Sequence, residues 1–187
     1  GIFEELQNKF SFPKEFRLAI PDIYGCWNNP PQEVIVLQDL SAEGFIAHDR
    51  HKPFTWQYAS TAVQQLAIFH ALTLALEQIR PREYKDTVDL LKNGLCSSRD
   101  FLIEAMFKTA KCSVQLIKEE NRGRVENYVG DIKTLMSKFY RPCRRPVIVH
   151  GDYRMSNILH KICKNGDMKL YILDYQTLHV GSVVNDL

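Results

Sequence analysis

The sequence lacks several features that assign proteins to broad classes. Its 187 residues carry a net charge of only +2 at pH 7, and the one basic cluster, Arg141–Arg145, is interpreted as a solvated loop, so nothing favours a nucleic-acid partner. The five cysteines are odd in number and never form a C-x-x-C pair, which argues against a disulfide framework or zinc site and is typical of a reducing, cytoplasmic location. No apolar run looks long enough to span a bilayer and no signal peptide precedes the first charged residues, so we expect no membrane partner.

Two polar motifs near the carboxyl end are the most informative part of what is present. The apolar run Val147–Val149 leads into a His-Gly-Asp turn that ends at Asp152, and Asn157 follows after four intervening residues. A second aspartate, Asp174, closes a later apolar run. Phosphoryl transfer needs an acceptor hydroxyl aligned with the γ-phosphate and metal ions that neutralise charge. We therefore predict that Asp152 orients the hydroxyl and takes its proton, while Asn157 and Asp174 hold Mg²⁺ on the phosphates of a nucleotide.

The segment between these motifs predicts a β-hairpin. Residues 158–160 and 168–173 are typical of strands, and the loop Lys164–Asp167 between them contains Asn-Gly. Asn-Gly is a strong hairpin signal because both residues tolerate positive φ. Such a hairpin would fold Asp174 back beside Asn157.

Periodicity elsewhere predicts mainly helices. Helices are expected over residues 3–10, 56–79, 100–119 and 125–139, with a polar turn at 119–124 between the last two. Pro81 should end the second helix, and Pro13 and Pro21 should leave the segment after the first helix as loop. A short all-apolar strand is expected over Val34–Leu37. Four side chains are assigned to the core: His70, Met106, Cys112 and Met136.

The motifs resemble those of kinase-like small-molecule phosphotransferases. The strings HGDYRMSNIL and LDYQ are similar to the HGD-x4-N and D-[FY]-Q motifs of the group that holds aminoglycoside phosphotransferases and choline kinases, and most similar to the ecdysteroid-kinase-like (CHK-type) family. Three more segments resemble that family in the right order along the chain: Val34–Leu40 with Gly44-Phe45, Leu66–Ala71, and Gly181-Ser182 with Asp186-Leu187. Several motifs in order identify a family far more specifically than any one of them.

The resemblance implies an α+β, protein-kinase-like fold in which ATP binds between a small lobe and a larger helical lobe. Residues 1–40 would be a residual small-lobe segment and hinge, and residues 41–187 the helical large lobe. Backbone groups of Gln38 and Leu40 would pair with the adenine edge. Before Val34 there is neither a Gly-rich phosphate loop nor an apolar strand with a lysine, since Lys9 lies in a helical pattern. We interpret the chain as a central fragment that is inactive by itself, with an exposed apolar edge at Val34–Leu37.

Two further assignments accompany the resemblance. The family more often has Leu-Trp or Cys-Trp where this sequence has Tyr153-Arg154. Arg154 lies two residues past the predicted base, where a cation could stabilise transition-state charge, although a solvent-facing arginine is an equal alternative. Asp186 is expected to be structural, accepting hydrogen bonds from catalytic-loop N–H groups as in other kinase-like folds.

The implied activity is transfer of a phosphoryl group from ATP, with Mg²⁺, to an alcohol group of a small molecule. A steroid hydroxyl is the family-level expectation, and choline-like or xenobiotic alcohols are alternatives. Two other classes stay open. The chain could be a non-catalytic remnant, because the small-lobe lysine is absent. It could also be a metal-dependent hydrolase with a ligand set drawn from His150, Asp152, Asn157, Asp174 and His179.

Overall fold

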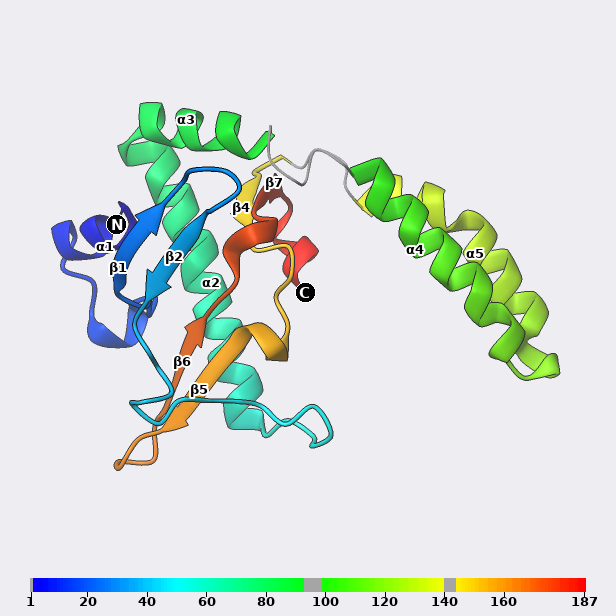
Figure 1. Cartoon of the computed structure of the whole chain (residues 1–187), viewed down its shortest axis with the longest axis horizontal. Coiled ribbons are helices and arrows are strands. Elements are labelled where there is room, and N and C mark those ends of the chain that lie inside the picture. The colour runs from blue at the N-terminus through cyan, green and yellow to red at the C-terminus, as the bar shows by residue number, and fades with distance from the viewer. Residues whose placement is uncertain (1, 93–98, 140–143) are drawn as a thin grey trace. The chain divides into compact units, whose positions relative to one another are not determined.

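The computed structural model describes residues 2–92, 99–139 and 144–187 (Figure 1). Helices and strands are mixed, which confirms the predicted α+β class. The chain divides into two compact units, Gly1–Tyr84 with Asp152–Tyr175 and Lys85–Gly151 with Gln176–Leu187. This division does not address the lobe boundary at residue 40, which stays a prediction.

The core of the first unit is a helix packed against a β-hairpin. Helix α2 (Trp56–Ile79) has the predicted bounds, and the Thr55 side chain caps it by accepting a hydrogen bond from the Tyr58 amide. Strands β5 (Ile158–Ile162) and β6 (Met168–Ile172) pair antiparallel, which confirms the predicted hairpin, and β3 (Ile46–Ala47) pairs with β5. Helix α2 runs beside β6 (Figure 1). Four buried side chains join the helix to the hairpin: Tyr58, Ala62, Ile158 and Leu170.

Helix α2 corrects the expectation that no apolar run is long enough to span a bilayer. By length and composition alone, this 24-residue helix could cross a membrane. Of its most apolar 18-residue window, 44% is buried inside the protein. His70 lies on this helix and is buried, which confirms its assignment to the core. The other buried residues of the helix include Leu66, Phe69, Leu72 and Leu76.

A second hairpin lies in the amino-terminal part of the first unit. Helix α1 (Ile2–Lys9) confirms the first predicted helix, and a single 3₁₀ turn follows at Lys14–Phe16. Strand β2 (Val34–Leu37) has the predicted bounds, but its partner β1 (Ile23–Trp27) falls where loop was expected. Pairing with β2 makes a strand of this segment, although Gly25 weakens its own strand signal. The β2 side chains retain 40–65% of their exposure, so the expected exposed apolar strand is present.

The second unit contains helices whose boundaries differ from those predicted. Pro81 ends α2 but also begins α3 (Pro81–Lys92), a helix that was not predicted, because proline is well tolerated at the first helical position. Helix α4 (Arg99–Ser113) ends before the predicted residue 119, and a 3₁₀ turn at Val114–Leu116 follows. The predicted polar turn at 119–124 is wrong: it forms the first turns of α5 (Glu119–Phe139), whose leading glutamates favour a helix amino terminus.

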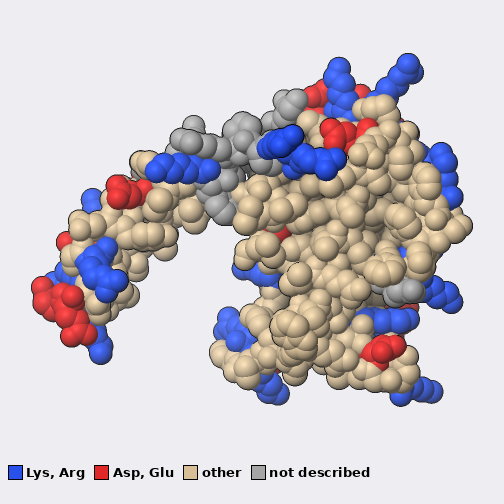
Figure 2. Space-filling model, turned by 180° about the vertical axis from the view of Figure 1, so that it is seen from behind, with Lys and Arg blue, Asp and Glu red and all other residues tan. Residues whose placement is uncertain are grey.

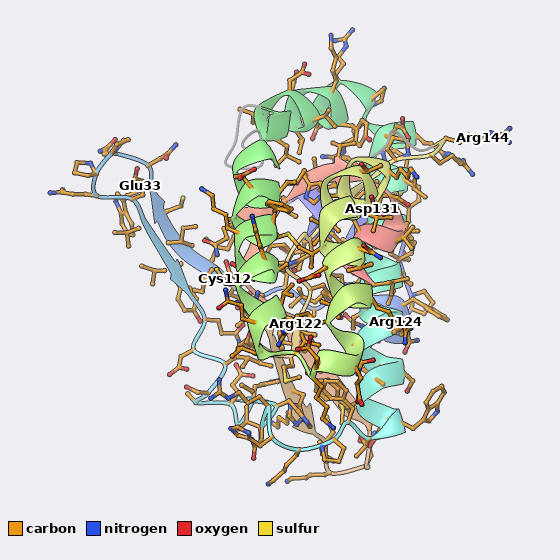
Figure 3. All side chains as sticks on the ribbon, turned by 90° about the vertical axis from the view of Figure 1, so that its right-hand side faces the viewer. Glu33, Cys112, Arg122, Arg124, Asp131 and Arg144 are labelled. Carbon is orange, nitrogen blue, oxygen red and sulfur yellow. The ribbon has the colours of Figure 1, made fainter. Side chains whose placement is uncertain are left out.

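Two core assignments are also wrong. Cys112 and Met106 are exposed on α4, because α4 and α5 pack along one face only (Figures 1 and 3). Met136 is half-buried. Arg144 and Arg145 of the basic cluster are exposed, and residues 140–143 lie outside the described residues. On the face drawn in Figure 2, basic and acidic side chains are interspersed.

Short strands complete the second unit. Strand β4 (Val147–Val149) is fully buried and pairs antiparallel with β7 (His179–Gly181), which was not predicted. A 3₁₀ turn at Val183–Asp186 follows β7. The three cysteines in the described residues, Cys26, Cys112 and Cys163, are free thiols.

Candidate active site

The loop after β4 is fixed by a glycine and a buried histidine. His150 is completely buried, and its carbonyl accepts a hydrogen bond from the Thr177 hydroxyl at 2.8 Å. Gly151 has φ +80°, and a Cβ atom there would lie 2.5 Å from the Thr177 carbonyl oxygen. Any side chain at this position would therefore clash with fixed backbone as well as strain the left-handed conformation. Sequence analysis did not single out Thr177, because a lone threonine carries no pattern.

Asp186 holds the same loop by its carboxylate. The His150 amide donates to one carboxylate oxygen at 2.9 Å, and the Gly151 amide donates to the other at 2.7 Å. Asp186 is only 7% exposed. Ser182 begins the turn that carries it, with the Asn185 side chain accepting from the Ser182 amide at 2.7 Å. The predicted hydrogen bonding of Asp186 to the loop is thus confirmed.

Asp152 follows directly and has a partner on each carboxylate oxygen. The Asn157 side-chain amide donates to one oxygen at 2.9 Å and to the Asp152 backbone carbonyl at 3.0 Å. Arg154 Nε lies 3.1 Å from the other oxygen. The Arg154 side chain is 66% exposed, so this ion pair fixes the orientation of the carboxylate more than it stabilises the fold. Arg154 faces solvent, as one of the two expectations had it, and its contact with Asp152 was not predicted. Its action on phosphate charge stays a prediction.

The β5–β6 hairpin brings Asn157 and Asp174 together. Ile158 pairs with Ile172, and the Leu173 amide donates to the Asn157 carbonyl at 2.8 Å. Asp174 is the next residue, which places it beside Asn157 as predicted. Its φ of +64° is in the left-handed region. Non-glycine residues seldom adopt this conformation, and those that do are often found at functional sites.

The donor set fits a magnesium ion. The Asn157 amide nitrogen is committed to Asp152, and Ser156 Oγ lies 3.4 Å from Asn157 Oδ1. That oxygen retains a second lone pair for a cation. One carboxylate and one amide oxygen, completed by phosphate and water, match the hard oxygen ligands that Mg²⁺ prefers. Burial raises the pKa of the Tyr175 phenol, whose ring lies against Phe69.

The hinge segment after β2 is shaped by a turn. The Gln38 amide donates to the Asp22 carbonyl at 2.8 Å, and the Leu40 carbonyl accepts from the amides of Glu43 and Phe45 at 3.2 and 3.1 Å. Within the described ranges, neither the Gln38 carbonyl nor the Leu40 amide has a backbone partner. This acceptor and donor, two residues apart, suit the edge of an adenine ring.

Two sequence features bear on the alternatives. Among residues 2–92, 99–139 and 144–187, no three His, Cys, Asp or Glu side chains form a group that could hold a metal. Lys9 lies on α1, exposed, with its ammonium 5.7 Å from the centre of the Phe10 ring. It is not on a strand, as the phosphate-pairing lysine of a kinase would be.

Comparison with known proteins agrees with the motifs. The family model of the ecdysteroid kinase-like family matches residues 2–187. The chain belongs to this family. It is therefore related to kinase-type phosphotransferases over almost its whole length. No curated protein and no solved structure matches the chain.

Proposed function

We propose that this member of the ecdysteroid kinase-like family contributes the catalytic centre of an ATP-dependent phosphotransferase that acts on an alcohol group of a small molecule. The observation that supports the proposal is the arrangement of three residues. Asn157 donates to Asp152 at 2.9 Å, and the amide of Leu173, the residue before Asp174, donates to the Asn157 carbonyl at 2.8 Å. A carboxylate for the acceptor hydroxyl and two oxygen ligands for a metal are the groups this chemistry requires.

Each side chain then has a distinct role. Asp152 orients the acceptor hydroxyl and receives its proton, because its carboxylate is held by Asn157 and Arg154 in a fixed orientation. Asn157 and Asp174 would hold Mg²⁺, which neutralises charge on the phosphates of ATP when bound. The guanidinium of Arg154 can also stabilise charge on the transferred phosphoryl group.

The surrounding fold suits an incomplete protein-kinase-like architecture. The Gln38 carbonyl and Leu40 amide would bind adenine at the hinge, and the helix-rich remainder would form the large lobe. In the described residues before Val34, the β1–β2 hairpin carries no lysine on a strand and no glycine-rich cover for phosphates. We therefore expect residues 1–187 to bind Mg·ATP weakly and not to turn it over without a complementary lobe.

Among the described residues before Val34, no lysine lies on a strand, which favours a second candidate, a non-catalytic binding protein. Two measurements separate the candidates. Isothermal titration of residues 1–187 with Mg·ATP should give weak, magnesium-dependent binding if the centre is intact. The full-length gene product should transfer label from γ-labelled ATP to an alcohol in a panel of steroid, choline-like and xenobiotic acceptors. Absence of both nucleotide binding and transfer would favour the non-catalytic candidate.

A further inference from the structure

Tyr153 lies between the proposed base and Arg154, and its side chain reaches the opposite side of the loop. Its hydroxyl donates to the Ala62 carbonyl on α2 at 2.7 Å. Its ring packs against the buried cluster that includes Tyr58 and Ile158. Tyr153, which follows Asp152 directly, is therefore attached to helix α2.

The backbone from Asp152 to Arg154 explains how the hydrogen bond between Tyr153 and Ala62 affects Asp152. Arg154 has φ −141° and ψ +163°, which is extended backbone. Successive side chains of extended backbone point to opposite sides, and here Tyr153 contacts Ala62 on α2 while Asp152 and Arg154 contact each other. The contact of Arg154 Nε with the Asp152 carboxylate at 3.1 Å shows this arrangement. The hydrogen bond of Tyr153 to α2 therefore holds the backbone between Asp152 and Arg154.

We infer that Tyr153 is a positioning residue that sets the orientation of the Asp152–Arg154 pair through its hydrogen bond to Ala62. The expected effect on turnover rests on the proposed function, whereas the orientation of the pair can be measured without activity. Ala62 lies inside a helix, where its carbonyl also accepts an amide four residues on. Tyr153→Phe therefore removes one anchor without leaving an unpaired carbonyl, and the fold should persist.

The chain offers a matched control in the same buried cluster. Tyr58 is 4% exposed, and its hydroxyl has no hydrogen-bond partner in the described part of the chain. Tyr58→Phe deletes the same atom from a neighbouring ring but removes no anchor. Its turnover should stay within twofold of wild type.

Kinetics on the full-length gene product test the inference. Tyr153→Phe should lower kcat about tenfold with the KM for ATP nearly unchanged, since a small misplacement of a catalytic group slows chemistry more than it weakens binding. In an Asp152→Asn background, Tyr153→Phe should have no further effect, because both changes act through one carboxylate. A kcat for Tyr153→Phe within twofold of wild type, or a full additional loss in the double variant, would overturn the inference.

A second readout does not depend on turnover. In residues 1–187, the ¹⁵N NMR signals of the Asn157 side-chain amide and of Arg154 Nε report the two contacts to Asp152. Tyr153→Phe should shift both signals and speed their hydrogen exchange, and Tyr58→Phe should leave them unchanged. If wild type transfers no phosphate but these signals respond as expected, the proposed function fails while the positioning role stands. Unchanged signals in Tyr153→Phe overturn the role whatever the activity.

Discussion

Two regions of the chain differ in how far their side chains are held by contacts within the described residues: the segment from Asp152 to Asp174 and the β1–β2 hairpin. In the catalytic segment, Asp152 has a partner on each carboxylate oxygen, and Asn157 and Leu173 close the β5–β6 end by a 2.8 Å hydrogen bond. In the hairpin, Ile35 is 65% exposed and Tyr24 68% exposed, and none of the strand residues is buried.

This difference shows which part of the proposed active site is held in place by contacts within the chain. Each carboxylate oxygen of Asp152 has a partner within the chain, so its orientation is set without a ligand. A two-stranded hairpin with exposed apolar faces is marginal in water and needs further strands or a cover. The residues proposed as base and metal ligands are therefore held by contacts within the chain, whereas the β1–β2 hairpin leaves its apolar side chains exposed.

The largest expected effect comes from removing the buried carboxylate that holds the loop before Asp152. Asp186→Ala leaves the His150 and Gly151 amides without their acceptors, so unfolding free energy should fall by roughly 2 to 5 kcal/mol. Melting temperature and activity should fall together, measured by calorimetry and by phosphate transfer. Loss of activity at unchanged melting temperature would instead show a direct chemical role for Asp186.

The next largest effect is on turnover and comes from replacing the proposed base, Asp152. Asp152→Asn in the full-length gene product should keep the fold and ATP affinity but reduce turnover by at least about a hundredfold, the usual size of a general-base contribution. Steady-state rates at saturating ATP measure it, with calorimetry as the control for folding. Turnover within threefold of wild type would exclude Asp152 as the base.

A smaller difference should separate the two metal ligands. Asp174→Ala should weaken Mg·ATP binding more than Asn157→Ala, because a charged ligand contributes more to a hard cation than a neutral amide oxygen. Titrations at several magnesium concentrations give the comparison. An unchanged magnesium dependence in both variants would show that the metal lies elsewhere.

The smallest effect concerns the uncovered hairpin. Strand β2 carries no charged residue to deter pairing with other chains, so residues 1–187 should self-associate. Ile35→Lys should reduce association in sedimentation velocity, and Val63→Lys, at a similarly exposed apolar position on α2, should not. Equal effects of the two substitutions would indicate a general change in solubility rather than pairing at β2.

The sequence predicted features that depend on local patterns better than those that depend on distant partners. The Asn165-Gly166 turn carries its own conformational preference, and the register that sets Asp174 beside Asn157 followed from it. β1 has no such signal, because it becomes a strand only through pairing with β2. The start of α5 was misplaced because a polar, charged segment is equally typical of a turn and of a first helical turn.

The site shows the same contrast. Asp152, Asn157 and Asp174 lie in motifs of fixed spacing, so their proximity could be predicted. The contact of Tyr153 with Ala62 joins residues 91 positions apart and has no counterpart in local sequence. The exposure of Cys112 likewise depends on which face of α4 packs against α5, which the spacing of apolar residues did not decide.

The most direct test of the proposed centre is to locate its metal. Mn²⁺ can replace Mg²⁺ in an NMR titration of residues 1–187 with ATP, where it broadens signals from nearby nuclei. We expect broadening of the Asn157 side-chain amide and the Asp174 backbone amide only when both Mn²⁺ and ATP are present. Signals of Asn157 and Asp174 that stay sharp while Mn²⁺·ATP is bound elsewhere would contradict a phosphotransfer centre at these residues.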